Sequence, residues 1–496
     1  MRTGQEYLES LNDGRTVILD GEVVENVGAH PAFAGIRNTT AELFDIAADP
    51  ANGMQFHSPE IDGPANLVFN IPRSPEDLAA RRRAVETWTK HTHGWVGRSP
   101  DHVGTFFAGF ASHPEVFAGE EGDDRDYAGN VQRFYERILR ENLYVTYAII
   151  PPQISRATTA SGWEGEFLQV GVVRETEEGI IVRGSQMLAT GGPVTDEVFV
   201  TCIKPLGPDD QDFAISFALP ASTPGMKMYC RRPYQTTATS DFDYPLTSRY
   251  DEHDVLMVFE DVLVPWDRVF INRNLGALRR QFFETGAHAL GNWQAQTRLT
   301  TKLKFIAAVA RKVTQVNGTD KIPGVQEKLG ELAAVVSCVE SALIAAQYTA
   351  EPDRNGVYIP GRRALYGIMG LQSETYPRAI QILRDLVGGG VMQIPSSVKD
   401  LHSEVSRGDV ERYVHSPGVP SEERVKLFKL AWDIIGSEFA GRHQQYELFY
   451  AGAPFVVKGA YTYRNFGYDE LVAELDEFLG GYSSQDSIDA LKQEAA

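Results

Sequence analysis

Apolar and polar positions follow three successive patterns along the chain. In the first part, apolar residues recur at helical spacing, which predicts helices over residues 40–48, 75–92 and 130–143. From Pro151-Pro152 to about residue 270 the apolar positions alternate, as at Val170 and Val172, and turn residues separate the runs. Short runs of this kind predict a compact antiparallel barrel or sandwich.

Helical spacing returns near Leu275 and continues almost to the end of the chain. The long amphipathic stretches predict a four-helix bundle over residues 300–316, 323–348, 376–387 and 422–452. We therefore predict an α+β protein with a mainly helical N-terminal domain (1–150), a central β domain (151–272) and a C-terminal four-helix-bundle domain with a tail (273–496). Because strands and helices do not alternate, the order argues against a Rossmann domain.

Composition and charge exclude several classes of function. The net charge of −20 argues against nucleic-acid binding, which needs a basic face. The three cysteines, Cys202, Cys230 and Cys338, are far apart, so they form neither a disulfide framework nor a CxxC metal site. The first residues lack an apolar signal region, and no uninterrupted apolar stretch approaches ~18 residues. We expect a cytoplasmic protein without a membrane or nucleic-acid partner and without a bound metal.

The stretch from Gly94 to His102 carries candidate chemistry. Ser99 followed by Pro100 predicts a helix N-cap with proline in the first turn, so that Arg98 lies just outside the helix and His102 in its first turn. A helix N-terminus favours an anion and disfavours a second positive charge, so the histidine is expected to stay neutral. This combination suits a phenolate, a carboxylate or a peroxide. The alternative is an ordinary capped helix with a solvated arginine and histidine.

Two further stretches could approach a flat or phosphorylated ligand. Thr190-Gly191-Gly192 ends a predicted strand with a small hydroxyl and two glycines, which lets backbone come close to a ring. The run Gly388-Gly389-Gly390 is of the kind that admits a phosphate near backbone N–H groups. The alternative is that both stretches are ordinary turns that bind no ligand.

Taken together, many segments in order resemble the 4-hydroxyphenylacetate 3-monooxygenase family of two-component aromatic hydroxylases. The resemblance covers nearly the whole chain. The matching segments are residues 1–4, 7–15, 97–101, 244–249, 264–266, 432–439 and 441–443. It implies an acyl-CoA dehydrogenase-like fold, usually as a homotetramer built from dimers. It also implies that a separate flavin reductase supplies FADH2, that a flavin C4a-hydroperoxide forms with O2, and that a small aromatic substrate, a phenol, is hydroxylated.

The resemblance also assigns roles to individual residues. Arg98 matches the family arginine beside substrate and flavin. The implied FAD contacts are Gln153, Ile154, Ser155, Arg156, Thr190, the run Gly388, Gly389 and Gly390, and Tyr450 in the segment 446–452; the glycine run and this segment are expected to act across a subunit boundary.

Two departures from the family pattern matter for the substrate. Where the hydroxyphenylacetate enzymes carry tyrosine four residues after the arginine, this chain has His102, and where they carry histidine it has Tyr147. Hydroxyl transfer needs an electron-rich phenolate, so we hypothesise that Arg98, His102 and Tyr147 are catalytic and bind the substrate, with the acid/base pair kept in exchanged positions. The alternative is that one or both are pocket walls. His288 and Trp293 are further candidates for the substrate cavity, although a core-packing role suits Trp293 equally well.

Other functions remain open at this point. A flavoprotein of the same fold could act as a dehydrogenase or dehydratase on an acyl thioester. The 4-hydroxybutyryl-CoA dehydratase branch needs cysteine ligands for an iron–sulfur cluster, and no cysteine lies near Arg98 and His102. A catalytically idle flavin-binding subunit is a third possibility, against which the retained Arg98 and Thr190 argue. The substrate itself, a phenol, halophenol, nitrophenol, indole or biosynthetic aromatic, is left undecided.

Overall fold

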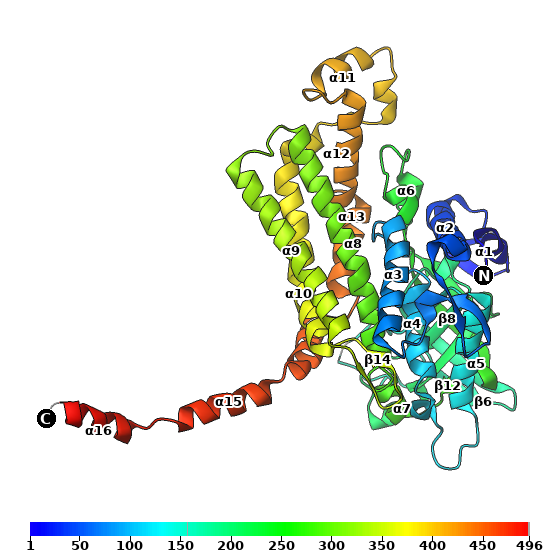
Figure 1. Ribbon diagram of the computed structural model, residues 1–496. Helices are drawn as coiled ribbons and strands as arrows, with labels where there is room; N and C mark the ends of the chain where they lie inside the picture. Colours follow the sequence, from blue (N-terminus) through cyan, green and yellow to red (C-terminus); the bar gives the residue numbers. More distant parts are fainter. Residues whose placement is uncertain (156, 495–496) are drawn as a thin grey trace.

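The computed structural model describes residues 1–155 and 157–494. Its β-strands and N-terminal helices lie beside a bundle of long helices, and the C-terminal helices extend away from this body (Figure 1). The predicted order of helices, strands and helices is confirmed. The helices of the first part are α1 (Gly4–Ser10), α2 (Ala34–Ala48), α3 (Pro75–His91), α4 (Asp101–Ala111) and α5 (Tyr127–Glu141).

Two main sheets form the β region. The six-stranded sheet has the order β2-β1-β10-β11-β7-β6, and the four-stranded sheet has the order β12-β9-β8-β5. Their strands are β1 (Thr16–Leu19), β2 (Glu22–Val24), β5 (Val145–Ala148), β6 (Gly171–Glu175), β7 (Gly179–Thr190), β8 (Glu197–Thr201), β9 (Ser216–Pro220), β10 (Met226–Cys230), β11 (Asp254–Pro265) and β12 (Val269–Ile271). Short hairpins elsewhere are β3 (Gln55–Ser58) with β4 (Gly63–Asn66) and β13 (Glu351–Pro352) with β14 (Tyr358–Ile359).

The expectation of a purely antiparallel β region is wrong at two places. β1 pairs in parallel with β10, and β5 pairs in parallel with β8. Both β1 and β5 precede residue 151, so strands from the first part of the chain complete both sheets. Parallel pairing needs a long connection, which these sequence-distant strands have. The alternation of apolar residues reports which face is buried, and it carries no information on strand direction.

The bundle consists of long helices whose starts and breaks differ from the prediction. They are α8 (Ala287–Val316), α9 (Pro323–Tyr348), α10 (Arg362–Val387), α12 (Ser421–Ile435) and α13 (Glu438–Phe449). α8 begins well before residue 300 because its first half is buried on almost every side, which removes the polar stripe that marks an amphipathic helix. The single helix expected over 422–452 is broken near Gly436, and the Ser437 hydroxyl accepts from the Ala440 N–H to cap α13.

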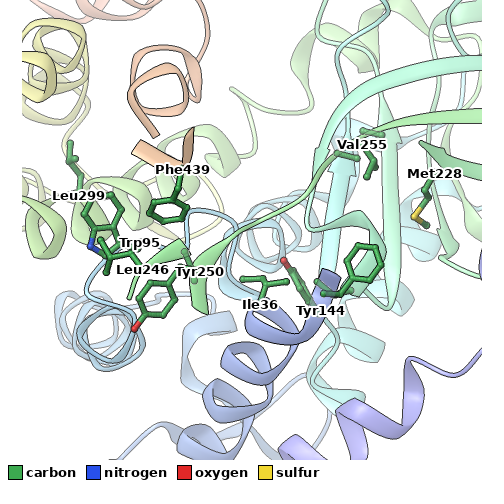
Figure 2. Packing of buried hydrophobic residues seen from close by; sticks show 14 of the residues in the cluster. Ile36, Trp95, Tyr144, Met228, Leu246, Tyr250, Val255, Leu299 and Phe439 are labelled. Carbon is green, nitrogen blue, oxygen red and sulfur yellow. The ribbon is translucent and has the colours of Figure 1, made fainter. Parts of the chain in front are cut away.

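One continuous apolar cluster joins the sheets to the bundle (Figure 2). At its centre Trp95 is fully buried, with its ring 5.6 Å from that of Phe439 of α13. Leu299 of α8 lies on the bundle side of the cluster, and Met228 of β10 lies on the sheet side. The segment before α4 is therefore clamped between the bundle and the β region, which fixes the position of the residues that follow it.

α9 has the length and composition of a helix that could cross a membrane. Its most apolar window has a mean hydropathy of 1.7, and 28% of that window is buried. The apolar stretch of α9 is not continuous, because Ser337, Glu340 and Ser341 interrupt it, and it therefore does not stand out in the sequence as a long apolar run. The helix packs against α8 and α10 in the bundle. Since a bundle helix can have the same length and composition, this feature alone does not indicate a membrane protein.

Candidate functional site

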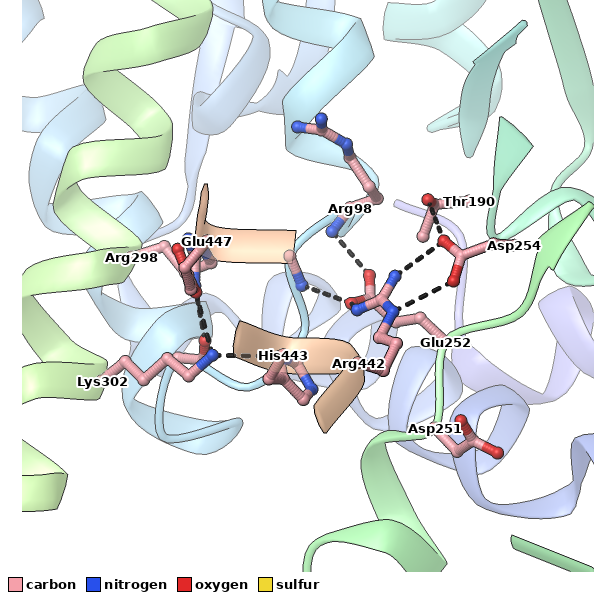
Figure 3. Close-up of polar contacts among 12 residues, drawn as sticks. Arg98, Thr190, Asp251, Glu252, Asp254, Arg298, Lys302, Arg442, His443 and Glu447 are labelled. Atoms are coloured by element: carbon pink, nitrogen blue, oxygen red, sulfur yellow. Dashed lines mark hydrogen bonds and ion pairs between the residues drawn. The ribbon is translucent and has the colours of Figure 1, made fainter. Parts of the chain in front are cut away.

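The backbone in front of α4 is held by a carboxylate from the segment that leads into β11. The two oxygens of Glu252 accept hydrogen bonds from the Gly97 N–H at 2.9 Å and from the Arg98 N–H at 2.6 Å (Figure 3). Gly97 must be a glycine, since a Cβ there would lie 2.3 Å from the Tyr446 hydroxyl of α13. The close approach of three separate chain segments thus places Arg98.

The predicted cap at this helix is wrong in detail. α4 begins at Asp101, and its N-terminus has no side-chain cap. The Ser99 hydroxyl instead donates to the Asp101 carboxylate. Because that carboxylate is completely buried and offers a strong acceptor, it takes the serine hydroxyl away from the helix amides. His102 still lies in the first turn, as predicted.

Arg98 is buried among aromatic rings and polar acceptors. Its Nη1 lies 2.6 Å from His102 Nε2, and its Nη2 donates to the Tyr450 carbonyl at 3.1 Å. The guanidinium carbon lies 5.0, 5.4 and 5.7 Å from the ring centroids of Tyr147, Tyr446 and Tyr450, respectively, within cation–π range. A buried cation surrounded mainly by neutral groups is a strong seat for an anion.

His102 is only 2% exposed, and its surroundings favour the neutral imidazole. Burial lowers its pKa well below the usual value, and the neighbouring Arg98 lowers the pKa further. This agrees with the expectation of a neutral imidazole, although burial is the main cause rather than the helix terminus. The ring can therefore accept a proton.

The structure brings Tyr147 into the same group, as predicted. Tyr147 lies on β5, and its ring centroid is 5.8 Å from that of His102 and 6.0 Å from that of Phe106. Arg98, His102 and Tyr147 thus come from the segment before α4, from α4 and from β5, respectively, and they meet around one buried cation. The residues were chosen from the resemblance, and their meeting is a finding of the tertiary structure.

A chain of buried charges, missed by the sequence analysis, links Thr190 to Arg98. The Thr190 hydroxyl donates to Asp254 at 2.6 Å, and Arg442 of α13 bridges Asp254 at 2.8 Å and Glu252 at 3.1 Å (Figure 3). Burial opposes ionisation of Asp254, yet Arg442 and Arg231 hold its pKa well below the usual range. The available signal was the acidic run at 251–254 together with an arginine in a matching helical segment.

A second cluster of buried charged side chains connects α8 with α13. Glu447 pairs with Arg298 at 2.6 Å and with Lys302 at 2.9 Å, and none of the three side chains is exposed. Lys302 Nζ also lies 3.0 Å from His443 Nδ1. Burial, partly offset by Glu447, lowers the pKa of Lys302 to about 7. This cluster ties α8 to α13 and so fixes the segment that carries Tyr450.

Tyr450 takes part in the site through both its backbone and its hydroxyl. The hydroxyl donates to Gln372 of α10 at 2.9 Å and accepts from Gln296 of α8 at 2.8 Å. With its carbonyl bound to Arg98, this residue joins three helices at one point.

The glycine run lies elsewhere in the same chain. Gly388, Gly389 and Gly390 are exposed and form a turn after α10, and a Cβ on Gly390 would lie 3.1 Å from Phe428 of α12. At 1.5 Å per helical residue, the chain from Gln372 to Gly388 covers about 24 Å. One chain therefore does not bring this turn to Arg98, and its role in flavin binding stays a prediction that requires a second subunit.

His288 and Trp293 lie along the first half of α8. His288 Nδ1 is 3.0 Å from the Tyr366 hydroxyl, and burial together with Arg362 lowers the pKa of His288 to about 3. Tyr461 packs on the same ring at 4.5 Å, so this histidine belongs to an aromatic cluster. Trp293 is 1% exposed, in keeping with a core role, and its indole N–H has no hydrogen-bond partner among residues 1–155 and 157–494.

The structure describes three of the four residues at 153–156 that the resemblance assigns to FAD binding. Ile154 is 58% exposed. The Ser155 hydroxyl accepts from the Ala157 N–H at 3.3 Å and from the Thr158 hydroxyl at 3.0 Å. Arg156 lies outside the described residues. The structure brings neither Ile154 nor Ser155 into hydrogen-bond contact with Thr190, and the role of Gln153 likewise stays a prediction.

Exposed apolar side chains lie near the end of β7 and on the segment next to it. Leu188 and Ile203 are 45% and 48% exposed, respectively, and Leu188 has a left-handed backbone with φ of 62°. They belong to adjacent segments, since the Met187 N–H donates to Ile150 and the Ile203 N–H donates to Ile149. Exposed aliphatic side chains beside a buried polar threonine suit the isoalloxazine of a flavin. Thr190 and this apolar surface would hold it.

The described part of the chain contains no group of three or more potential metal-ligating side chains. Cys202, Cys230 and Cys338 are all free, and only Cys202 is buried. No cysteine side chain is among the contacts of Arg98 or His102. These positions do not supply the thiolates of an iron–sulfur cluster.

Comparison with known families decides the relationship. A family model described as the 4-hydroxyphenylacetate 3-hydroxylase N terminal matches residues 3–271, and the model of its C terminal matches residues 278–480. The chain belongs to the 4-hydroxyphenylacetate 3-hydroxylase family. The resemblance stated from the sequence is thereby confirmed. Among relatives, a 4-hydroxyphenylacetate 3-monooxygenase oxygenase component of Thermus thermophilus is 35% identical over 91% of this chain and 92% of its own length.

Two further relatives in this family act on other phenols. A Streptomyces globisporus monooxygenase for a carrier-bound (3S)-3-amino-3-(3-chloro-4-hydroxyphenyl)propanoyl group is 35% identical over 91% of this chain and 85% of its own length. A 4-nitrophenol 2-monooxygenase oxygenase component of a Rhodococcus species is 33% identical over 91% of this chain and 86% of its own length.

Solved structures confirm the fold. The oxygenase component of 4-hydroxyphenylacetate 3-monooxygenase, in complex with FAD and 4-hydroxyphenylacetate, matches with a TM-score of 0.91 at 33% identity. The match covers 99% of this chain and 100% of that chain. An archaeal 4-hydroxybutyryl-CoA dehydratase matches with a TM-score of 0.87 at 21% identity, a likeness that concerns the fold alone.

Proposed function

We propose that this chain is the oxygenase component of a two-component monooxygenase that hydroxylates a small phenolic substrate with FADH2 and O2. The observation that carries the proposal is the buried group of Arg98, neutral His102 and Tyr147. Family membership supports the reaction class, and the relatives' names support a phenol as substrate. Bound reduced FAD supplies the activated oxygen, and a separate reductase supplies the FADH2.

The side chains of this group bind and ionise the substrate. Arg98 pairs with the phenolic oxygen and stabilises it as the phenolate. His102, neutral and within 2.6 Å of Arg98, accepts the phenolic proton at Nε2 once the guanidinium turns toward the anion. Tyr147, whose ring lies 5.0 Å from the guanidinium carbon of Arg98 and 5.8 Å from the ring of His102, can donate a hydrogen bond to the same oxygen. The buried surroundings exclude water, which limits wasteful loss of the activated oxygen as H2O2.

The exchange of tyrosine and histidine argues against 4-hydroxyphenylacetate itself as substrate. The base of this chain, His102, lies on α4 instead of on β5. We therefore expect the aromatic ring of the substrate to take a different position in the site from that of 4-hydroxyphenylacetate. Relatives that accept a nitrophenol and a carrier-bound chlorophenol indicate how widely the family's substrates vary. A dehydrogenase or dehydratase acting on an acyl thioester is not favoured by any feature of the Arg98 group.

Product analysis tests the function directly. The purified chain is mixed with chemically or enzymatically reduced FAD, air and a panel of phenols, halophenols, nitrophenols and indoles, and products are identified by mass. We expect an increase of one oxygen atom for at least one phenol, and no such product from the Arg98→Met variant. Oxidation of all FADH2 to H2O2 with every aromatic would contradict the proposal.

We also propose that the chain forms a homotetramer in which its C-terminal segment packs on another copy. α15 (Tyr468–Gly480) extends away from the body in Figure 1. It exposes an apolar stripe at helical spacing: Tyr468, Leu471, Val472, Leu475, Phe478 and Leu479. Such a stripe needs a partner surface to be stable in water. The most apolar window of α9, of which only 28% is buried, is a second apolar surface of the same chain, and the exposed glycine run needs another subunit to approach the flavin site.

The oligomer is tested by replacing Leu475 and Phe478 with aspartate in the full chain. Light scattering after gel filtration is expected to show the tetramer dissociating to smaller species, while exchange of the acidic Glu470 and Glu474 for glutamine leaves the mass unchanged. An unchanged tetramer mass in the aspartate variant, or a monomeric wild-type protein, would contradict the proposal.

A further inference from the structure

Gln294 lies between the imidazole of His102 and the carboxylate of Asp101. Gln294 Oε1 is 3.1 Å from His102 Nδ1, and Gln294 Nε2 donates to Asp101 Oδ2 at 2.9 Å. All three side chains are at most 2% exposed. Gln294 belongs to the part of α8 whose extent the amphipathic pattern did not reveal, and the proposed reaction gives it no role so far.

The hydrogen-bond roles in this chain of residues have a single consistent assignment. A guanidinium only donates, so His102 Nε2 must accept from Arg98 at 2.6 Å. The proton of a neutral imidazole then resides on Nδ1, which donates to Gln294 Oε1. This leaves the amide nitrogen of Gln294 to donate to Asp101, which accepts on its other oxygen from Ser99.

We infer that Gln294 is a positioning residue that holds His102 with its proton on Nδ1 and its bare Nε2 toward Arg98, and that couples the ring to the carboxylate of Asp101. Arg98 alone enforces the same tautomer only while it donates to Nε2. When an anion draws the guanidinium away, Gln294 is the remaining contact that keeps Nε2 free to accept a proton. The positioning role stands on the geometry, and its catalytic consequence rests on the proposed hydroxylation.

The charged groups around His102 explain why its contact with Gln294 affects its protonation. Arg98 precedes the ring on the same segment, Arg298 of α8 adds further positive charge, and Tyr147 faces the ring from β5. Asp101 is the acidic group that reaches the ring through Gln294; burial raises the pKa of Asp101, and the positive charge of Arg81 of α3 partly offsets this effect. Once Nε2 takes up a proton, the Gln294–Asp101 pair is therefore the route by which negative charge stabilises the imidazolium.

Solid-state NMR of protein carrying nitrogen-15 histidine tests this assignment without substrate or flavin. The resonances of His102 are identified by their loss in His102→Asn. At neutral pH we expect a protonated Nδ1 and an unprotonated Nε2. In Gln294→Glu, made throughout together with Asp101→Asn so that no second carboxylate opposes the new one, a carboxylate lies directly on Nδ1–H, and the ring is expected to become doubly protonated at a higher pH than in the wild type. Gln294→Met, of similar volume, is expected not to produce this shift.

Gln281→Glu is the matched control. Gln281 is also completely buried and donates to the Thr201 hydroxyl at 2.9 Å, so its replacement by glutamate imposes the same burial cost on a different contact. It is expected to leave the His102 titration unchanged. A wild-type proton on Nε2, or a Gln294→Glu titration equal to that of the wild type, would overturn the inference.

A kinetic arm separates this inference from the proposed function. In Gln294→Glu the acidic limb of the pH profile for hydroxylation is expected to move upward, as the NMR titration does. If no aromatic is hydroxylated by the wild type, the proposed function fails, and the NMR arm still decides the proton position. If the NMR titration shifts and the pH profile does not, the coupling to catalysis is overturned and the proposed function stands.

Discussion

Glu252 holds Arg98 by its backbone, with 2.6 Å between the carboxylate and the arginine N–H, while the guanidinium of Arg98 is left to other partners. The same carboxylate pairs with Arg442 of α13 at 3.1 Å. A single side chain thus connects the start of β11, the segment before α4 and a bundle helix. The position of the Arg98 backbone therefore depends on the buried ion pair between Glu252 and Arg442.

Replacing Glu252 by glutamine is expected to destabilise the protein by about 3–5 kcal/mol, because it leaves Arg442 with an uncompensated part of its buried charge. The thermal unfolding midpoint measures this. Glu260→Gln is the control, since Glu260 is 57% exposed and pairs with Lys227 on the surface. That pair is worth about 0–1 kcal/mol. Equal midpoints for the two variants would contradict the structural role of Glu252.

Lys302 predicts a specific pH dependence of stability. Burial lowers the pKa of Lys302 from 10.5 to about 7. Between these values the unfolded chain binds a proton that the folded chain lacks, so the contribution of this group to stability rises with pH. Relative to Lys302→Met, the wild type is expected to gain about 2 kcal/mol between pH 7 and pH 9.

Thermal unfolding of both proteins across this pH range provides the measurement. Lys304→Met is the control on the same helix, because Lys304 is 51% exposed. Its difference from the wild type is expected to stay constant with pH. A constant difference for Lys302→Met as well would mean that Lys302 stays protonated in the folded state.

His102→Asn is expected to uncouple FADH2 oxidation from hydroxylation. Loss of a general base typically slows the step by about 100-fold or more, so the activated oxygen is lost as H2O2 before it reacts. Product formed per FADH2 consumed measures the coupling, and the exposed His91→Asn serves as control. Unchanged coupling at all pH values would remove His102 from the mechanism.

Thr190→Val tests the hydroxyl at the end of β7. The variant keeps the shape but removes the 2.6 Å hydrogen bond to Asp254. We expect binding of FAD, followed by its fluorescence, to weaken by up to about tenfold, since a hydrogen bond between the Thr190 hydroxyl and the flavin would contribute about 0.5–1.5 kcal/mol. Thr223→Val, in a turn away from the site, is expected to bind FAD as the wild type does. Identical affinities for both variants would exclude Thr190 from the flavin site.

Local sequence patterns determined the types and order of the elements in this protein. The alternating strands after residue 151 follow from a period of two, and α9 has the predicted bounds of 323–348. Strand direction, the early start of α8 and the break at Gly436 were not determined in this way. Strand direction depends on long connections, and the start of α8 depends on burial from all sides. The break has a local signal, Gly436 followed by the Ser437 cap, which the spacing of apolar residues does not register.

The sequence by itself also supplied the candidates Arg98, His102, Tyr147 and Thr190: Arg98 and Thr190 match a known family, and His102 and Tyr147 are departures from its pattern. Only the tertiary structure showed that Glu252, Asp254 and Arg442 support them, and that Gln294 connects His102 to Asp101. The physical reason is that buried polar groups are satisfied by partners far away in the chain, about 60 to 190 positions apart here. No local pattern of residues encodes such partners. The folded core determines them, because it decides which buried polar groups lie next to one another.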